Sequence, residues 1–186
     1  MGFLEIFLIG VGLAMDAFAV AICKGLAMDR IKVKNALIIG AYFGLFQGAM
    51  PIIGYLLGVQ FQDKITAIDH WVAFVLLALI GANMIRESLS KEEVKPDASV
   101  DWKTMSVLAI ATSIDALAIG VTFAFLQVNI IAAASVIAVV TFIISLLGVK
   151  IGNIFGVKYK AKAEFVGGAI LIILGLKILL EHIGIL

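Results

Sequence analysis

Hydrophobic residues dominate this chain in six long stretches that shorter polar segments separate. The stretches run over about residues 3–23, 36–59, 71–89, 104–126, 129–151 and 165–184. Each has roughly the 20 mostly apolar residues that a helix needs to cross the hydrocarbon core of a bilayer. Hydrophobic residues make up 63% of the chain and charged residues only 15%, unlike a soluble domain. The pattern predicts an all-α membrane protein with six transmembrane helices in a lipid bilayer.

One tight helical hairpin is expected inside the longest apolar run. The run from Thr104 to Val149 is too long for a single crossing, and Gln127-Val128-Asn129 is the polar break within it. Residues 90–103, which hold several charges and a proline, are typical of a solvated loop. We therefore expect three parts: a first half over residues 1–89, a connecting loop over 90–103 and a second half over 104–186.

The basic residues favour one orientation of these helices. The first, third and fifth connections hold four Lys or Arg residues each, which makes twelve of the fourteen in the chain. Basic residues accumulate on the cytoplasmic side of membrane proteins. We therefore expect these three connections, including the 90–103 loop, in the cytoplasm and both termini on the extracytoplasmic side.

The two halves align with each other as an internal repeat. Residues 16–21 (DAFAVA) match residues 115–120 (DALAIG) at an offset of 99, and the later helices match at an offset of 94. The later alignment pairs Asn35 with Asn129, Gly54 with Gly148, Gly58 with Gly152, Gly81 with Gly175, and Glu87 with Glu181. Three helices are an odd number, so the second repeat must cross the membrane in the opposite sense. Two inverted three-helix repeats are thus predicted, an architecture typical of secondary transporters that bind substrate near the membrane midplane.

Each repeat carries one aspartate inside its first helix, Asp16 and Asp115. A carboxylate at the bilayer centre costs at least about 2.5–3.5 kcal/mol, so it is retained where it has a partner, a proton, a cation or a wet cavity. Small residues share the face of each aspartate: Gly12, Ala19 and Cys23 in the first helix, and Ala111, Ala118 and Thr122 in the fourth. Such faces let helices approach closely, and two neighbouring carboxylates would share a proton or bind a hard divalent cation. The alternative is that each aspartate caps a kink or bonds a nearby hydroxyl.

Oxygen-bearing side chains at matched positions extend this candidate metal site. Gln47 and Thr141 align between the repeats, and both offer the oxygen ligands that hard cations prefer. Gln47 lies four residues before Pro51, whose ring removes the hydrogen bond to the Gln47 carbonyl; a plain proline kink is the competing interpretation. The accessory candidates are Met15, Thr112, Ser113, Asn83 and Lys177. For the hydroxyls the alternative is a bond to their own helix, and for Lys177 it is snorkelling to the outer interface.

These motifs resemble those of the MntP family of manganese efflux pumps, within the wider LysE-type exporter group. The resemblance rests on residues 15–19 (MDAFA) followed by Lys24-Gly25, on 112–116 (TSIDA), on 51–54 (PIIG), on 70–77 (HWVAFVLL) and on 125–131 (FLQVNII). It implies that Mn²⁺ is exported from a bacterial cytoplasm across the inner membrane, with Asp16 and Asp115 essential. Some family members carry glutamate at the position of Gln47, so the resemblance does not extend to a three-carboxylate site.

The expected mechanism is alternating access by a secondary transporter rather than catalysis. Mn²⁺ would displace a proton shared by the two aspartates, the repeats would rock, and returning protons would release the metal outside. The alternatives within transport are export of another divalent cation or of an amino acid, as in LysE-type exporters. An intramembrane diaspartyl protease is disfavoured because the chain lacks a Gly-x-Gly-Asp motif. A net charge of +1 gives no basis for nucleic-acid binding, no fixed cofactor is expected, and the sequence leaves an oligomer open.

Overall fold

The computed structural model of the chain is built from helices. It describes residues 1–28, 30–60, 69–89 and 99–155, together with residues 165, 169–170, 172–173, 175–177 and 179–180. Its elements are α1 (Phe3–Leu26), α2 (Val33–Val59), α4 (Asp69–Leu89), α5 (Trp102–Thr112), α6 (Ile114–Phe125) and α7 (Ile130–Phe155). The described residues from Phe165 onward are helical as well. Since these residues contain no strand, the predicted all-α class is confirmed.

Three of the helices are long and apolar enough to cross a membrane: α1, α2 and the Ile130–Ile154 part of α7. The pair α5 and α6 forms a fourth candidate, because together the two helices have the length and composition of one bent crossing. The chain is therefore a multi-pass membrane protein by length and composition. Six crossings stay a prediction, which depends on the segments 71–89 and 165–184.

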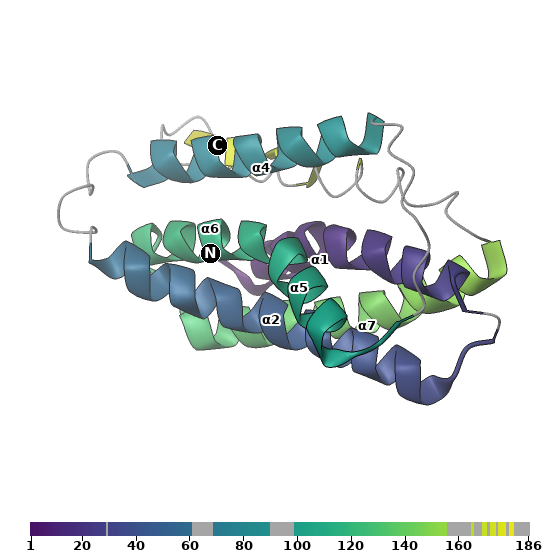
Figure 1. Cartoon of the computed structure of the whole chain (residues 1–186). Coiled ribbons are helices and arrows are strands. Elements are labelled where there is room, and N and C mark those ends of the chain that lie inside the picture. The colour runs from purple at the N-terminus through teal and green to yellow at the C-terminus, as the bar shows by residue number, and fades with distance from the viewer. Residues whose placement is uncertain are drawn as a thin grey trace.

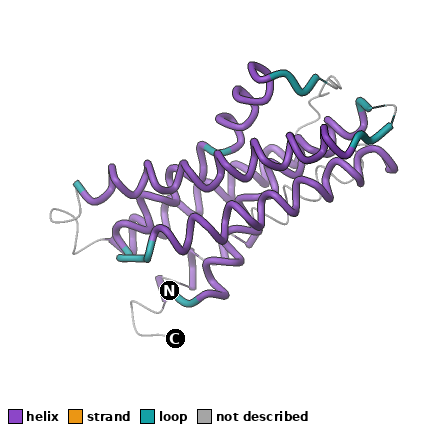
Figure 2. The backbone as a smooth tube through the Cα atoms, turned by 90° about the horizontal axis from the view of Figure 1, so that it is seen from below, coloured by secondary structure: helices purple, strands orange, loops and turns teal. Residues whose placement is uncertain are grey.

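The fourth predicted helix, over residues 104–126, is not continuous, and that expectation is wrong. It breaks at Ser113, where α5 and α6 are bent by 44°. The Ser113 hydroxyl donates to the carbonyl oxygens of Ala109 at 2.6 Å and of Ile110 at 3.2 Å. A hydroxyl that bonds carbonyls of the preceding turn competes with backbone N–H groups and bends a helix. Figure 2 shows the result, a short helix that projects from the long ones.

The turn predicted at residues 127–129 is confirmed between α6 and α7, but the two helices do not pack against each other as a tight hairpin, because both pack on α2 instead. Gln127 adopts a positive φ of 51°, and the Val128 N–H donates to the Phe123 carbonyl at 3.0 Å. A residue with positive φ after a helix lets a following N–H bond one of the last helical carbonyls, and this ends α6 and reverses the direction of the chain. The Asn129 side chain accepts a hydrogen bond from the Ala132 N–H at 3.1 Å and so caps the start of α7.

The closest packing joins helices from different halves of the chain. α7 packs along α1 and crosses α2, while α2 packs along α6 (Figure 1). The glycines in these contacts leave no room for a side chain: a Cβ on Gly54 would overlap the Leu117 carbonyl of α6, and one on Gly152 would overlap the Ile22 carbonyl of α1. α4 lies over α6 as a separate layer in Figure 1, next to the described C-terminal residues.

Buried hydrogen bonds tie three connections together at one end of the bundle. Lys24 is only 3% exposed, and its ammonium donates to the Ser99 carbonyl at 2.7 Å. The expected end of the first helix at residue 23 is therefore too early, since Lys24 lies in the last turn of α1. Asn153, near the end of α7, donates to the carbonyls of Gly25 at 3.2 Å and Met28 at 2.6 Å. These bonds bring together the end of α1, Ser99 and the end of α7, which adjoin the three predicted connections that are rich in basic residues.

Candidate metal site

Asp16 lies near the middle of an unbroken helix. Its side chain in α1 is partly buried, and α1 continues for ten residues beyond it to Leu26. Gly12, Ala19 and Cys23, which share its face, are all buried. The predicted small-residue face of the first helix is therefore packed against the rest of the bundle.

Asp115 has a different setting from Asp16, although the two align in the sequence. It is the second residue of α6 and lies in the first turn after the break. The N-terminus of a helix carries a partial positive charge from its unpaired N–H groups, which attracts a nearby negative group. Of its predicted face, Thr122 is buried while Ala111 is exposed. The break therefore places this carboxylate in the first turn of a helix, whereas Asp16 lies within a continuous one.

Gln47 connects α2 to the turn of α1 that precedes Asp16. Its side chain is fully buried, and its Nε2 donates to the Leu13 carbonyl oxygen at 3.2 Å. The amide oxygen, Oε1, has no hydrogen-bond partner among the described residues. An unpaired buried carbonyl is uncommon in proteins and requires an explanation, such as an ion or water. Gln47 thus presents a free oxygen ligand close to the helix that carries Asp16.

Two hydroxyls on α7 are buried in the same unpaired state. Thr141 and Ser145 are both 0% exposed, and neither hydroxyl oxygen has a partner in the part of the chain that the structure describes. The two residues lie four apart, which places them on one face of the helix. Thr141 is one of the residues predicted from the sequence, whereas Ser145 is not, although its spacing of four residues from Thr141 is a signal that could reveal it.

The accessory candidates have four different outcomes. The Thr112 and Ser113 hydroxyls both donate to the Ala109 carbonyl, at 3.3 and 2.6 Å. These are bonds to a carbonyl of the preceding helical turn, which is the alternative to metal binding given above. Met15 packs against a cluster of buried apolar residues. Lys177 forms an ion pair with Glu5 at the N-terminal end of α1. The side chain of Asn83 lies outside the described residues.

The chemistry of these residues suits a cation held by a mixture of charged and neutral oxygens. No group of three His, Cys, Asp or Glu side chains gathers within the described ranges. A hard divalent cation prefers carboxylate, carbonyl, hydroxyl and water oxygens, and two aspartates with Gln47 and Thr141 would offer that mixture. The predicted approach of the two carboxylates to each other stays a prediction.

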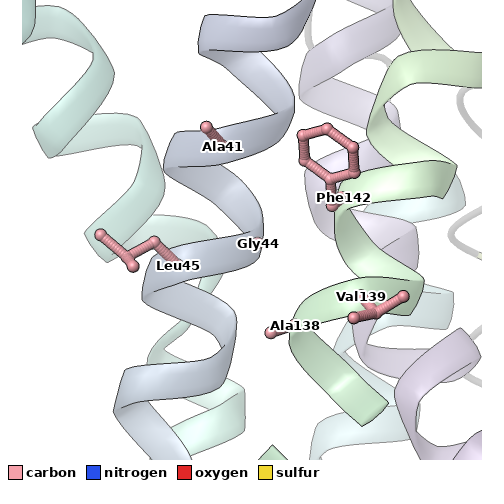
Figure 3. Close-up of a pocket in the computed structure, with 6 residues that line it drawn as sticks. All are labelled: Ala41, Gly44, Leu45, Ala138, Val139 and Phe142. Atoms are coloured by element: carbon pink, nitrogen blue, oxygen red, sulfur yellow. The ribbon is translucent and has the colours of Figure 1, made fainter. Parts of the chain in front are cut away.

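A surface pocket between α2 and α7 is chemically unsuited to an ion. It has a volume of about 250 Å³ and is lined by Ala41, Gly44, Leu45, Ala138, Val139 and Phe142 (Figure 3). None of these side chains carries a charge or a hydrogen-bonding group, so a cation there would find no ligand to replace its water. The candidate site is therefore the polar interior rather than this pocket.

Comparison with known proteins gives a consistent result. Residues 30–179 match the family described as "Mntp: Putative manganese efflux pump". A "Putative manganese efflux pump MntP" of Desulfitobacterium hafniense (strain Y51) is 62% identical over 186 residues, which cover 100% of this chain and 98% of that protein. Proteins of the same name from Acetivibrio thermocellus and Mannheimia succiniciproducens are 59% and 57% identical; the matches cover 100% and 98% of this chain and 94% and 98% of theirs. No solved structure matches the chain.

Proposed function

Given that this chain belongs to the MntP family of manganese efflux pumps, we propose that it exports Mn²⁺ from the bacterial cytoplasm across the inner membrane. The names of its relatives support the substrate. The observation that carries the proposal is the placement of Asp16 and Asp115 within apolar helices of a multi-pass membrane protein. Ionisable residues inside a membrane are costly, and they mark ion pathways more often than structural positions.

We propose six crossings arranged as two inverted repeats, and the glycine contacts support this arrangement. A Cβ on Gly54 of α2 would meet Leu117 of α6, and one on Gly148 of α7 would meet Phe18 of α1. The two glycines differ by the offset of 94 found between the halves, and Phe18 and Leu117 differ by the offset of 99. The α1–α7 contact thus repeats the α2–α6 contact, as a two-fold relation between the repeats would require.

The hydrogen bonds at one end of the bundle support the proposed orientation. Lys24, Ser99 and Asn153 bring together the three connections that hold most of the basic residues. A single end with this charge is the one that remains in the cytoplasm. Both chain termini would then lie on the extracytoplasmic side.

In the proposed site, Asp16 and Asp115 supply the negative charge, and the Gln47 Oε1 and Thr141 Oγ1 atoms supply neutral oxygens. Water would complete the coordination of a hard cation. The site would open alternately to the two sides of the membrane, and protons taken up by the carboxylates outside would displace the metal. Proton antiport has its own test: Mn²⁺ uptake into inverted vesicles should alkalinise the lumen, and an unchanged lumenal pH would refute it.

The function is tested by measuring cellular manganese in a bacterium that lacks its own exporter and is loaded with Mn²⁺. The native protein, Asp16→Asn and Asp115→Asn are compared at equal expression, because asparagine keeps the size of aspartate and removes the charge. We expect the native protein to lower cellular manganese and both variants to lose this effect. If the native protein lowers another divalent metal or an amino acid instead, the substrate is wrong. If the variants export normally, the aspartates are structural.

A further inference from the structure

The unpaired hydroxyls of α7 differ from the hydroxyls of Thr122 and Ser135, which also lie within apolar helices. Thr122 donates to the Ala118 carbonyl at 3.3 Å, and Ser135 donates to the Ile131 carbonyl at 2.8 Å, each within its own helix. This is the usual way in which serine and threonine are satisfied inside apolar helices. Thr141 and Ser145 make no such bond, although both are fully buried. A buried hydroxyl without a partner destabilises a protein, so the two residues indicate a ligand that the protein itself does not supply.

Their position along α7 places both hydroxyls opposite the middle of α1. On one side, a Cβ on Gly10 of α1 would meet Ile137 at 3.5 Å. On the other side, a Cβ on Gly148 would meet Ala21 and Phe18 at 2.9 Å. Thr141 and Ser145 lie between these two contacts on the same ridge of α7. By this register Ser145 lies at the level of the α1 turn that contains Asp16, and Thr141 lies about one turn further toward Gly10.

We infer that Ser145 is an additional oxygen ligand of the exported cation, one helical turn from Thr141 on the side of Lys24. This inference rests on the proposed function and deepens it. The cation would accept the hydroxyl lone pair that has no partner in the protein, and the Gln47 Oε1 atom would serve it from α2 in the same way. The Gln47 amide is oriented for that role, because its Nε2 is already engaged by the Leu13 carbonyl.

The competing explanation is a buried structural water that satisfies the same oxygens. The two explanations differ in their effect on stability. If Ser145 only holds a water, removing the hydroxyl alters stability and leaves the affinity for Mn²⁺ unchanged. If it is a ligand, removing it lowers the affinity for Mn²⁺, while the metal-free protein is as stable as before or more stable, since an unpaired polar group is lost.

The first experiment measures how Mn²⁺ raises the unfolding temperature of the purified full-length protein in detergent. The variant is Ser145→Ala, and the matched control is Ser135→Ala on the same helix, where the hydroxyl is exposed and bonded. We expect Ser145→Ala to need about tenfold more Mn²⁺ for half of the maximal rise, as for the loss of one bond to a charged ligand. The control should match the native protein. A native titration curve for Ser145→Ala overturns the inference alone, whereas no response in the native protein overturns the proposed function as well.

The second experiment uses cysteine chemistry and does not depend on stability. Cys23 is the single cysteine of the chain, so Cys23→Ala provides a background for Ser145→Cys. We expect Mn²⁺ to slow the alkylation of the new cysteine by a small thiol reagent in membranes, and we expect Cd²⁺ to slow it more strongly, because thiolates favour soft metals. Alkylation that proceeds at one rate with and without either metal places position 145 outside the cation path and overturns the inference.

Discussion

Replacing Gly54 by alanine would place a methyl group against the backbone of α6. The new Cβ would lie 2.9 Å from the Leu117 carbonyl carbon and closer still to its oxygen. Carbon atoms in contact are separated by about 3.5–4.0 Å, and a backbone carbonyl cannot rotate out of the way as a side chain can. Overpacking costs about 1–3 kcal/mol, and we expect Gly54→Ala at the upper end of that range. For a chain of this length the apparent Tm should fall by roughly 6–12 °C.

The repeat-related glycine provides a sharp comparison. A Cβ on Gly148 would meet the Ala21 Cβ, the edge of the Phe18 ring and the Phe18 carbonyl oxygen, each at 2.9 Å. These contacts overlap far less than the contact between a Cβ on Gly54 and the Leu117 oxygen. Gly148→Ala should therefore cost about 1 kcal/mol, or roughly 2–4 °C. In the next pair along the helices the order is reversed. A Cβ on Gly152 would overlap the Ile22 carbonyl oxygen, whereas a Cβ on Gly58 would lie 2.8 Å from the Ala124 Cβ and 3.1 Å from the Val121 backbone.

The assay is thermal unfolding of each purified variant in detergent, followed by circular dichroism at 222 nm. Gly10→Ala is the control within the α1–α7 contact, since its Cβ would find ordinary contacts at 3.5 Å. It should leave Tm unchanged or raise it, because alanine is the better helix former. The reasoning is refuted if Gly148→Ala lowers Tm as much as Gly54→Ala does, or if Gly10→Ala is as damaging as either.

Two further predictions concern the end of the bundle that carries Lys24. Asn153→Leu leaves the Gly25 and Met28 carbonyls without their side-chain donor and should lower Tm by roughly 2–8 °C, from about 1–2 kcal/mol; a Tm equal to that of the native protein would show that water replaces the amide without loss. Hydrogen bonds from Ser99 and Thr104 hold the pKa of Asp101 in the folded state well below its usual value. The ionised carboxylate therefore stabilises the folded state fully at pH values above the unfolded-state pKa of about 4. This stabilisation is lost as the pH falls toward the lower pKa of the folded state. The difference in Tm between the native protein and Asp101→Asn should thus be constant from pH 7 to 5 and shrink below pH 4, and a difference that already closes between pH 7 and 5 would contradict this assignment.

The sequence predicted the helices well because apolar length is a strong signal. The turn at 127–129 is predictable because polar residues interrupt an otherwise apolar run, whereas the packing of α6 and α7 on α2 depends on distant parts of the chain. The break at Ser113 was missed for the opposite reason: the run on both sides of it is apolar, and only the direction of one hydroxyl bond separates a bent helix from a straight one. Lys24 was assigned to a loop because lysine is rarely buried, and its bond to Ser99 depends on a contact between distant parts of the chain.

The candidate site was predictable in its charged members and less so in its neutral ones. An aspartate within an apolar helix stands out at once, whereas a serine there is common and usually bonds its own helix. Ser145 differs only in lacking that bond, which is a property of the folded chain. The orientation of the Gln47 amide likewise depends on the Leu13 carbonyl of another helix.

The pairing of α1 with α7 sets the order in which this protein can be assembled. α1 emerges from the ribosome first, but its main partner begins only at Ile130, and the α6 partner of α2 begins at Ile114. Membrane helices insert singly and associate afterwards, so the small-residue faces of α1 and α2 must wait in lipid until the second half arrives. We therefore expect a truncated first half to remain inserted yet loosely associated, and open to degradation by membrane proteases. Quality control of this chain would act on that interval rather than on insertion itself.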